Sequence, residues 1–217
     1  MKFSIKTGIL LVILVVPVFF YFFVQWQGWH KAEPLLPYYI PKVVEDTIQG
    51  EIIIDTTYHQ VHFLDFIKTD RTILSENDLR GNICVANLFF ATCQKECPIA
   101  MNHLLKVNEY CNRFEKLKML SYSIDPVNDS PEQLKRYAEG LGVNEANWYL
   151  LHGTTSVVEE QAREFYLTNQ GATIHSNKIV LIDQDQYIRG YYSALIEASI
   201  DTLLLDIAVL LNSKKHE

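Results

Sequence analysis

The apolar residues between positions 83 and 211 fall into short runs and amphipathic stretches that alternate along the chain. The run Ile83–Phe90 carries no charge, which is typical of a central strand in a parallel sheet. The stretch Cys93–Lys116 has an apolar face at helical spacing and predicts a helix. The same patterns predict strands at Leu117–Ile124 and Trp148–His152, a strand hairpin at Lys178–Asp183 and Tyr187–Tyr192, and a last helix at Ile196–Leu211.

Two further helices are indicated by their start signals. Ser130-Pro131-Glu132-Gln133 is a capping box with proline at the first helical position, and Gly140 or Gly142 is expected to end that helix. Ser156–Glu159 is interpreted as a second capping box, opening a helix to about Leu167. Strands that alternate with helices and end in a hairpin predict an α/β fold, with a central mixed sheet flanked by helices.

Smaller elements are expected before residue 83. Glu51–Ile54 and Val61–Phe66 have the composition of a strand pair, with a turn near Thr57. Ser75–Arg80 predicts a short helical turn that Gly81 closes.

An uncharged apolar segment lies near the N-terminus. Residues 8–24 and Gln25–Trp29 together approach the roughly 20 residues that cross a bilayer. Lys2 and Lys6 precede the segment, which predicts a cytoplasmic N-terminus and an exported remainder. A cleaved signal peptide is the alternative, but the segment is long and no A-x-A-like cleavage site follows it. We therefore expect residues 1–29 to form a single-pass anchor in the inner (cytoplasmic) membrane, with the soluble domain on the periplasmic or extracytoplasmic side.

The residues after this segment predict a spacer and then one domain. Pro34, Pro37 and Pro41 favour extended, polyproline-like chain. We expect a stiff spacer over residues 30–48 and one soluble domain over residues 49–217, which is long enough to bury a sizeable core.

The expected exported part is acidic. The chain has 19 basic and 26 acidic residues, and only Lys2 and Lys6 precede residue 30, so 17 basic residues oppose 26 acidic ones, a formal charge of −9. This balance disfavours nucleic acid or anionic lipid as a partner and suits a basic partner or a cationic cargo.

Four cysteines are too few for a disulfide scaffold in a chain of this length. Cys84 lies in an apolar strand and Cys111 in a helical stretch, so both are interpreted as small buried hydrophobic residues. Cys93 and Cys97 lie instead where the Ile83–Phe90 strand gives way to a helix.

The Cys93–Cys97 pair has the position of the thioredoxin dithiol, at the end of a core strand and the start of a helix. Amides and dipole at a helix N-terminus stabilise thiolates and lower their pKa. The spacing suits either disulfide exchange or a soft metal ion. A general reductase of the thioredoxin type places a cis-proline from a later strand against its disulfide, and the last proline of this chain is Pro131.

A metal site would need a third ligand. Two thiolates select Cu(I), and an imidazole completes a trigonal site. His175 lies in a polar stretch before a core strand and His152 ends a strand, so position favours His175 while leaving His152 open. The remaining histidines are less suitable by position: His30, His59, His62, His103 and His216.

Three ordered motifs resemble the Sco (SenC/PrrC) family of copper-binding, thioredoxin-fold assembly proteins, over about residues 60–210. Leu88–Pro98 resembles its CxxxCP signature, and Ser123–Leu134 resembles its S-x-DP-x-x-D-(T/S)-P-E-x-L segment. Ile174-His175-Ser176, followed by Ile179–Asp183, resembles its histidine segment, with isoleucine where the family usually has aspartate.

This resemblance implies a thioredoxin-like fold and a copper site of Cys93, Cys97 and His175, which would hold Cu(I), Cu(II) or both. It implies a membrane-tethered chaperone that assists copper insertion into the CuA centre of cytochrome c oxidase, with an oxidase subunit as client and a copper donor protein. Cys93 and Cys97 would also form a redox dithiol. Asp125 and Asp129 could be read as metal ligands, but turn and capping roles beside Ser130 are favoured.

Two other functions stay open at this point. One is an exported thiol–disulfide oxidoreductase or thiol peroxidase without a metal role. The other is a redox or copper sensor that docks to a membrane partner without catalysis.

Overall fold

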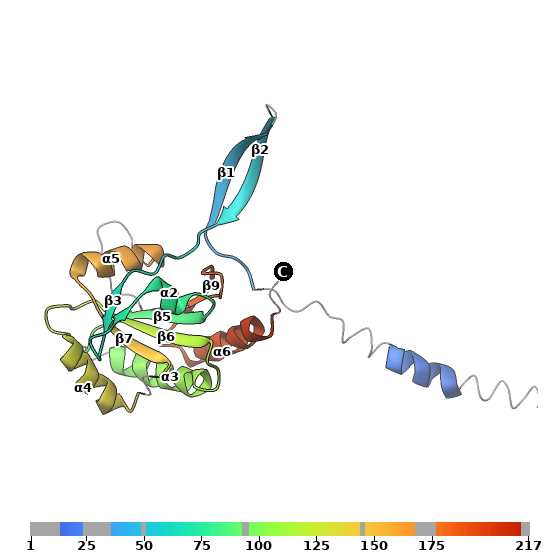
Figure 1. The fold of residues 1–217 in the computed structure, drawn as a ribbon. Coiled ribbons are helices and arrows are strands. Elements are labelled where there is room, and N and C mark those ends of the chain that lie inside the picture. Colours follow the sequence, from blue (N-terminus) through green and yellow to red (C-terminus); the bar gives the residue numbers. More distant parts are fainter. Residues whose placement is uncertain are drawn as a thin grey trace, which may run out of the picture. The chain divides into compact units, whose positions relative to one another are not determined.

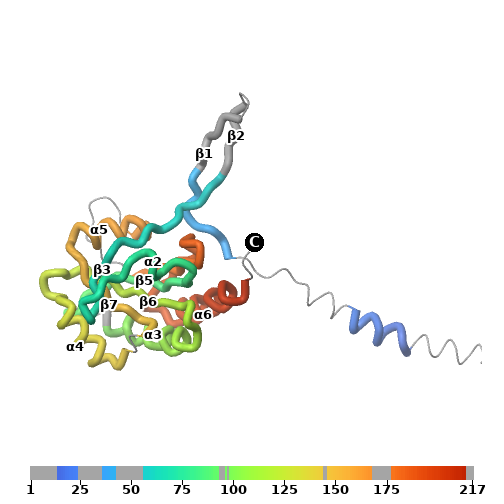
Figure 2. The backbone as a smooth tube through the Cα atoms, viewed as in Figure 1, coloured from blue at the N-terminus to red at the C-terminus, as the bar shows by residue number. Residues whose placement is uncertain are grey.

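The computed structural model describes residues 14–23, 36–48, 51–92, 96–143, 146–167 and 177–213, and Figure 2 traces their backbone. The chain divides into two compact units, Met1–Leu35 and Leu36–Glu217. Residues 14–23 of the first unit are helical. Within the ranges just given, no helix has both the length and the apolar character that a bilayer crossing needs. The other residues of the predicted anchor over residues 1–29 lie outside the described part.

The second unit is built on a seven-stranded mixed sheet in the order β4-β3-β7-β6-β5-β8-β9 (Figure 1). The central strands β5, β6 and β7 are parallel, and β8 runs antiparallel to β5. The strands are β3 (Phe66–Lys68), β4 (Ile73–Leu74), β5 (Ile83–Phe89), β6 (Leu117–Ser123), β7 (Trp148–His152), β8 (Lys178–Ile182) and β9 (Ile188–Ser193).

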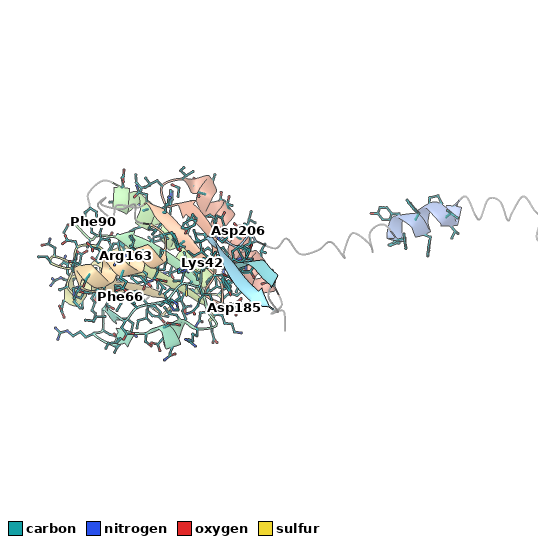
Figure 3. The ribbon with its side chains drawn as sticks, turned by 90° about the horizontal axis from the view of Figure 1, so that it is seen from above. Lys42, Phe66, Phe90, Arg163, Asp185 and Asp206 are labelled. Carbon is teal, nitrogen blue, oxygen red and sulfur yellow. The ribbon has the colours of Figure 1, made fainter. Side chains whose placement is uncertain are left out.

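Helices cover both faces of this sheet (Figure 1). Because successive side chains of a strand point to opposite faces, Val85 of β5 joins one hydrophobic cluster and Cys84 and Ala86 join the other. Helices α3 (Glu96–Cys111), α4 (Pro131–Leu141) and α6 (Glu197–Asn212) pack on the Val85 side, and α2 (Glu76–Leu79) and α5 (Thr155–Glu164) pack on the other. Figure 3 shows these side chains from above, with Arg163 on α5 and Asp206 on α6.

The core strands predicted from the sequence are confirmed to within a few residues, and the helix predicted over residues 93–116 is α3, which ends at Cys111. The helix that Ser130 was expected to cap is α4: the Ser130 side chain accepts a hydrogen bond from the Gln133 amide. Gly142, with φ of 69°, ends that helix in the left-handed conformation that glycine adopts without strain. The predicted turn at Ser75 is α2, followed by Gly81 with φ of 73°.

The region predicted as a spacer contains a strand. Residues 36–48 belong to the second unit, and β1 (Pro41–Ile48) pairs antiparallel with β2 (Glu51–Tyr58) in a separate two-stranded sheet. Pro41 is compatible with this pairing because it is the first residue of its strand, a position where a missing amide is tolerated. The expected turn near Thr57 is wrong, since Thr57 pairs with Lys42 inside the hairpin.

The strand expected at Val61–Phe66 is also wrong, although its alternation is real. Val61 and Phe63 are buried, but the intervening amides bond to side chains of α5 rather than to a strand. The His62 amide donates to Glu164 Oε2 at 2.9 Å, and the Leu64 amide donates to Gln161 Oε1 at 2.8 Å.

The predicted helix start at Ser156 is two residues late. Helix α5 begins at Thr155 with Thr154 as its N-cap residue, and the Ser156 hydroxyl pairs with the Thr154 hydroxyl at 3.1 Å. Capping boxes specify a helix start well, but neighbouring hydroxyl residues compete for the role.

Candidate functional site

The three predicted site residues fall largely outside what the structure describes. Cys93 and His175 lie outside the described residues, and for Cys97 only the backbone is described, in the first turn of α3. Among the described side chains, no three His, Cys, Asp or Glu residues converge as a metal site would require. The surroundings of the three residues are described and locate the segments that carry them.

The Cys93 and His175 segments are attached to the same edge of the sheet. Phe89, the last residue of β5, pairs with Ser123, the last residue of β6. Strand β8 runs antiparallel to β5 and begins at Lys178, so its first residues lie at this edge as well. Cys93 follows β5 by four residues and His175 precedes β8 by three. Edges where parallel strands end are common ligand sites in α/β folds.

A hydrogen bond joins the two segments directly. The Asn177 side-chain amide donates to Glu96 Oε2 at 2.7 Å. Asn177 is two residues beyond His175, and Glu96 immediately precedes Cys97. This contact ties the end of the histidine segment to the first turn of the cysteine helix.

A pocket lies beside this contact. Its volume is about 10 Å³, roughly enough for one water molecule, and its lining residues include Phe89 of β5, Met101 of α3 and Asn177. Met101 is one helical turn beyond Cys97, so the pocket borders both predicted ligand segments.

Asp129 holds the chain that leads into the cysteine motif. Its side chain is 0% exposed, and Oδ2 accepts hydrogen bonds from the Ala91 amide at 3.0 Å and the Ser123 hydroxyl at 2.6 Å. Its main-chain carbonyl lies 2.8 Å from His152 Nδ1. Sequence reasoning assigned Asp129 a turn or capping role and missed these contacts, because Ala91 lies 38 residues away along the chain.

The other candidates from the sequence are accounted for by local contacts. Asp125 accepts hydrogen bonds from the Asn128 side chain at 2.8 and 3.0 Å, which confirms its turn role. His103 Nδ1 lies 2.8 Å from the Ala194 carbonyl, so this histidine packs within the fold, as its position in the sequence suggested. His152, through its contact with Asp129, lies at the same edge as the cysteine motif.

Cys84 and Cys111 are buried free thiols, as predicted. Burial raises the pKa of each to about 12. Both thiols therefore stay protonated near neutral pH, whereas the thiolate is the form that attacks a disulfide or binds a metal. Cys84 and Cys111 are therefore unsuited to disulfide exchange or metal binding.

The sheet order, the parallel β5–β6–β7 centre, the terminal β8–β9 hairpin and helices on both faces define a thioredoxin-like α/β fold. A family model described as SCO1/SenC matches residues 55–211, most of the chain. The chain belongs to the SCO1/SenC family.

Individual relatives are distant but cover most of the chain. The SCO1 protein homolog of Bacillus subtilis is 25% identical over 166 residues, covering 73% of this chain and 86% of the relative. BsSco, a solved member of the Sco family of cytochrome c oxidase assembly proteins, is 24% identical, with a TM-score of 0.63 over 72% of this chain and 95% of that one. Yeast Sco1, solved with copper bound, is 18% identical, with a TM-score of 0.55 over 72% and 91%. Both structures support the fold.

Proposed function

We propose that this protein carries copper as a cargo, held by the Cys93 and Cys97 thiolates and the His175 imidazole, and supplies it to cytochrome c oxidase during assembly. Family membership and the copper-bound yeast Sco1 support copper as the cargo. The observation that carries the proposal is the hydrogen bond between Asn177 and Glu96, because it links the His175 and Cys97 segments.

The ligand set fits the chemistry of copper. Thiolates are soft ligands that select Cu(I), and a neutral imidazole adds a third ligand without further charge. The first turn of a helix, where Cys97 lies, favours anionic groups through its free amides. We propose that copper, as Cu(I), Cu(II) or both, is held in this way.

The client and the location are further parts of this proposal. We propose that the protein inserts copper into the CuA centre of an oxidase subunit, its client, and that it receives the copper from a separate donor protein. We place the domain outside the cytoplasmic membrane, tethered by residues 1–29. The apolar sequence of residues 8–24 and the preceding Lys2 and Lys6 support this placement.

A second function of the same cysteines is reduction of a client disulfide. The structure of BsSco was solved in work on a disulfide switch, which favours this candidate. One thiolate would attack the client disulfide to form a mixed disulfide, and the other cysteine would displace the client thiol. The client disulfide gains two electrons and two protons, and Cys93 and Cys97 become a disulfide.

The test is Cu(I) binding by the full chain in detergent, measured by competition with a Cu(I) chelator. We expect equimolar binding, and a loss of affinity of about 100-fold or more in Cys93→Ser or Cys97→Ser. His175→Ala should lose about tenfold or more. His62→Ala, which removes an exposed imidazole and leaves the backbone contact of His62 intact, is the matched control and should bind like the unmodified chain. Full Cu(I) binding by Cys93→Ser or His175→Ala would contradict the ligand assignment.

A further inference from the structure

Asp129 is the one fully buried carboxyl group at the cysteine edge among the described residues. It is 0% exposed, and it lies in the connection between β6 and α4. A buried carboxyl group is costly unless its oxygens are paired. Oδ2 has two donors, but Oδ1 is buried without a hydrogen-bond partner, and no ion pair of Asp129 is found in the described part of the chain. Its presence there therefore needs an explanation.

Local structure does not need this side chain. Ser130 caps α4 by accepting a hydrogen bond from the Gln133 amide. Asp125 builds the preceding turn, with its carboxylate on Asn128 and its carbonyl accepting from the Asp129 amide at 2.9 Å. The turn and the helix start are thus both formed without the Asp129 carboxyl group.

The side chain acts instead between neighbouring strands. The Asp129 carboxylate accepts from Ala91, which follows the end of β5, and from Ser123, which ends β6. His152, which ends β7, contacts the main-chain carbonyl of Asp129. Asp129 is therefore the point at which three adjacent strand ends are joined. Ala91 is two residues before Cys93, so the bond to its amide fixes the chain as it enters the cysteine motif.

We propose that Asp129 is a positioning residue for the copper-binding segment, acting through the Ala91 amide. The inference rests on the proposed function, since it deepens the account of the same site. Holding the chain in place before the metal arrives lowers the entropy that binding must otherwise remove. Asp129 contributes no metal ligand in this account.

The experiment compares three variants of the full chain in detergent. Asp129→Ala removes the acceptor of the Ala91 amide, whereas Asp129→Asn keeps an oxygen that can accept it. Ser130→Ala is the matched control, because it removes the cap of the neighbouring helix but no contact with Ala91. Cu(I) affinity is measured by chelator competition, and hydrogen exchange of a peptide containing Ala91 is followed by mass spectrometry.

We expect Asp129→Ala to lower Cu(I) affinity about tenfold and to speed exchange at Ala91, while Asp129→Asn stays within about threefold of the unmodified chain. Ser130→Ala should change neither quantity. The inference is overturned if Asp129→Ala binds Cu(I) within about twofold of the unmodified chain, or if Ser130→Ala lowers affinity equally. An equal loss in Asp129→Asn would overturn the role of the amide contact.

Two further arms keep the result decisive. Should Asp129→Ala fail to fold, Asp129→Ser takes its place with the same expectation. Its hydroxyl is one bond shorter than the carboxylate, so the Ala91 amide loses the acceptor at the Oδ2 position, while a polar group remains in the buried site. If the unmodified chain bound no Cu(I), the proposed function would fail on its own. The inference would then be judged by the alkylation rates of Cys93 and Cys97, and unchanged rates in Asp129→Ala would overturn it.

Discussion

Two buried aspartates lie at opposite edges of the sheet and differ in how fully their carboxylate oxygens are hydrogen-bonded. Asp183, after the end of β8, is 4% exposed and fully paired: Oδ2 accepts from Arg189 at 2.7 Å, and Oδ1 accepts from the Asp185 and Tyr187 amides at 3.0 and 2.9 Å. Asp129, at the cysteine edge, has no such cation, and its Oδ1 is without a partner among the described residues.

The Asp183 edge fastens the N-terminal part of the domain. Arg189 is 7% exposed, and besides Asp183 it donates to the carbonyl oxygens of Leu36 and Pro37 and lies 4.0 Å from the centroid of the Tyr38 ring. Two of the three guanidinium nitrogens hold residues 36 and 37 on β9, and the third donates to Asp183. At the Asp183 edge, both carboxylate oxygens are hydrogen-bonded and the contacts hold the fold together. At the cysteine edge, one carboxylate oxygen of Asp129 has no hydrogen-bond partner among the described residues.

The largest effect should come from breaking the Asp183 edge. Arg189→Ala leaves the Asp183 carboxylate buried without its cation, so we expect the free energy of unfolding to fall by about 3–5 kcal/mol. Arg80→Ala, which breaks the exposed Arg80–Glu76 pair, is the control and should cost about 0.5 kcal/mol or less. Urea denaturation followed by circular dichroism measures both. A loss in Arg189→Ala no greater than that in Arg80→Ala would refute the architectural role.

At the cysteine edge, Asp129→Ala should destabilise less than Arg189→Ala. It leaves the Ala91 amide and the Ser123 hydroxyl without their acceptor, a cost of about 1–3 kcal/mol, but it strands no charge. The same denaturation experiment gives the value. If Asp129→Ala cost more than Arg189→Ala, the contrast between the two edges would not hold.

A smaller change in stability is expected from the Glu96–Asn177 contact. Because both side chains are exposed, Glu96→Ala should alter the free energy of unfolding by no more than about 0.5 kcal/mol. Its Cu(I) affinity should nevertheless fall about threefold, since the His175 segment loses its link to α3. Glu96→Gln, which keeps an acceptor for Asn177, should bind like the unmodified chain. Equal affinities in Glu96→Ala and Glu96→Gln would remove the contact from the site.

The thiols should show no reaction at all where the fold buries them. At pH 8 we expect iodoacetamide to leave Cys84 and Cys111 unmodified in the native chain, because burial raises the pKa of each to about 12. The folded-state pKa lies above the ordinary value of 9.0, so the unfolded chain ionises first and stability falls as the pH rises beyond that value. Mass spectrometry of labelled peptides, before and after unfolding in urea, measures the difference. Labelling of Cys84 in the native chain would show that its strand opens.

The sequence by itself determined the elements whose signals are local. The uncharged run of β5, the Ser130 cap of α4 and the glycine that ends it depend on neighbours a few residues away. The three motifs also determined the family. The positions of Cys93, Cys97 and His175 as ligands stay predictions, because their side chains lie outside the described part.

Only the tertiary structure decided which distant groups meet. Arg189 holds carbonyl oxygens more than 150 residues away, the Leu64 amide bonds to α5, and Asp129 reaches Ala91. No hydrophobic periodicity or local sequence motif signals these contacts, because each depends on which segments the folded sheet brings side by side. The core strands and helices from residue 83 onward could thus be predicted from the sequence, whereas the contacts that prepare the cysteine edge could not.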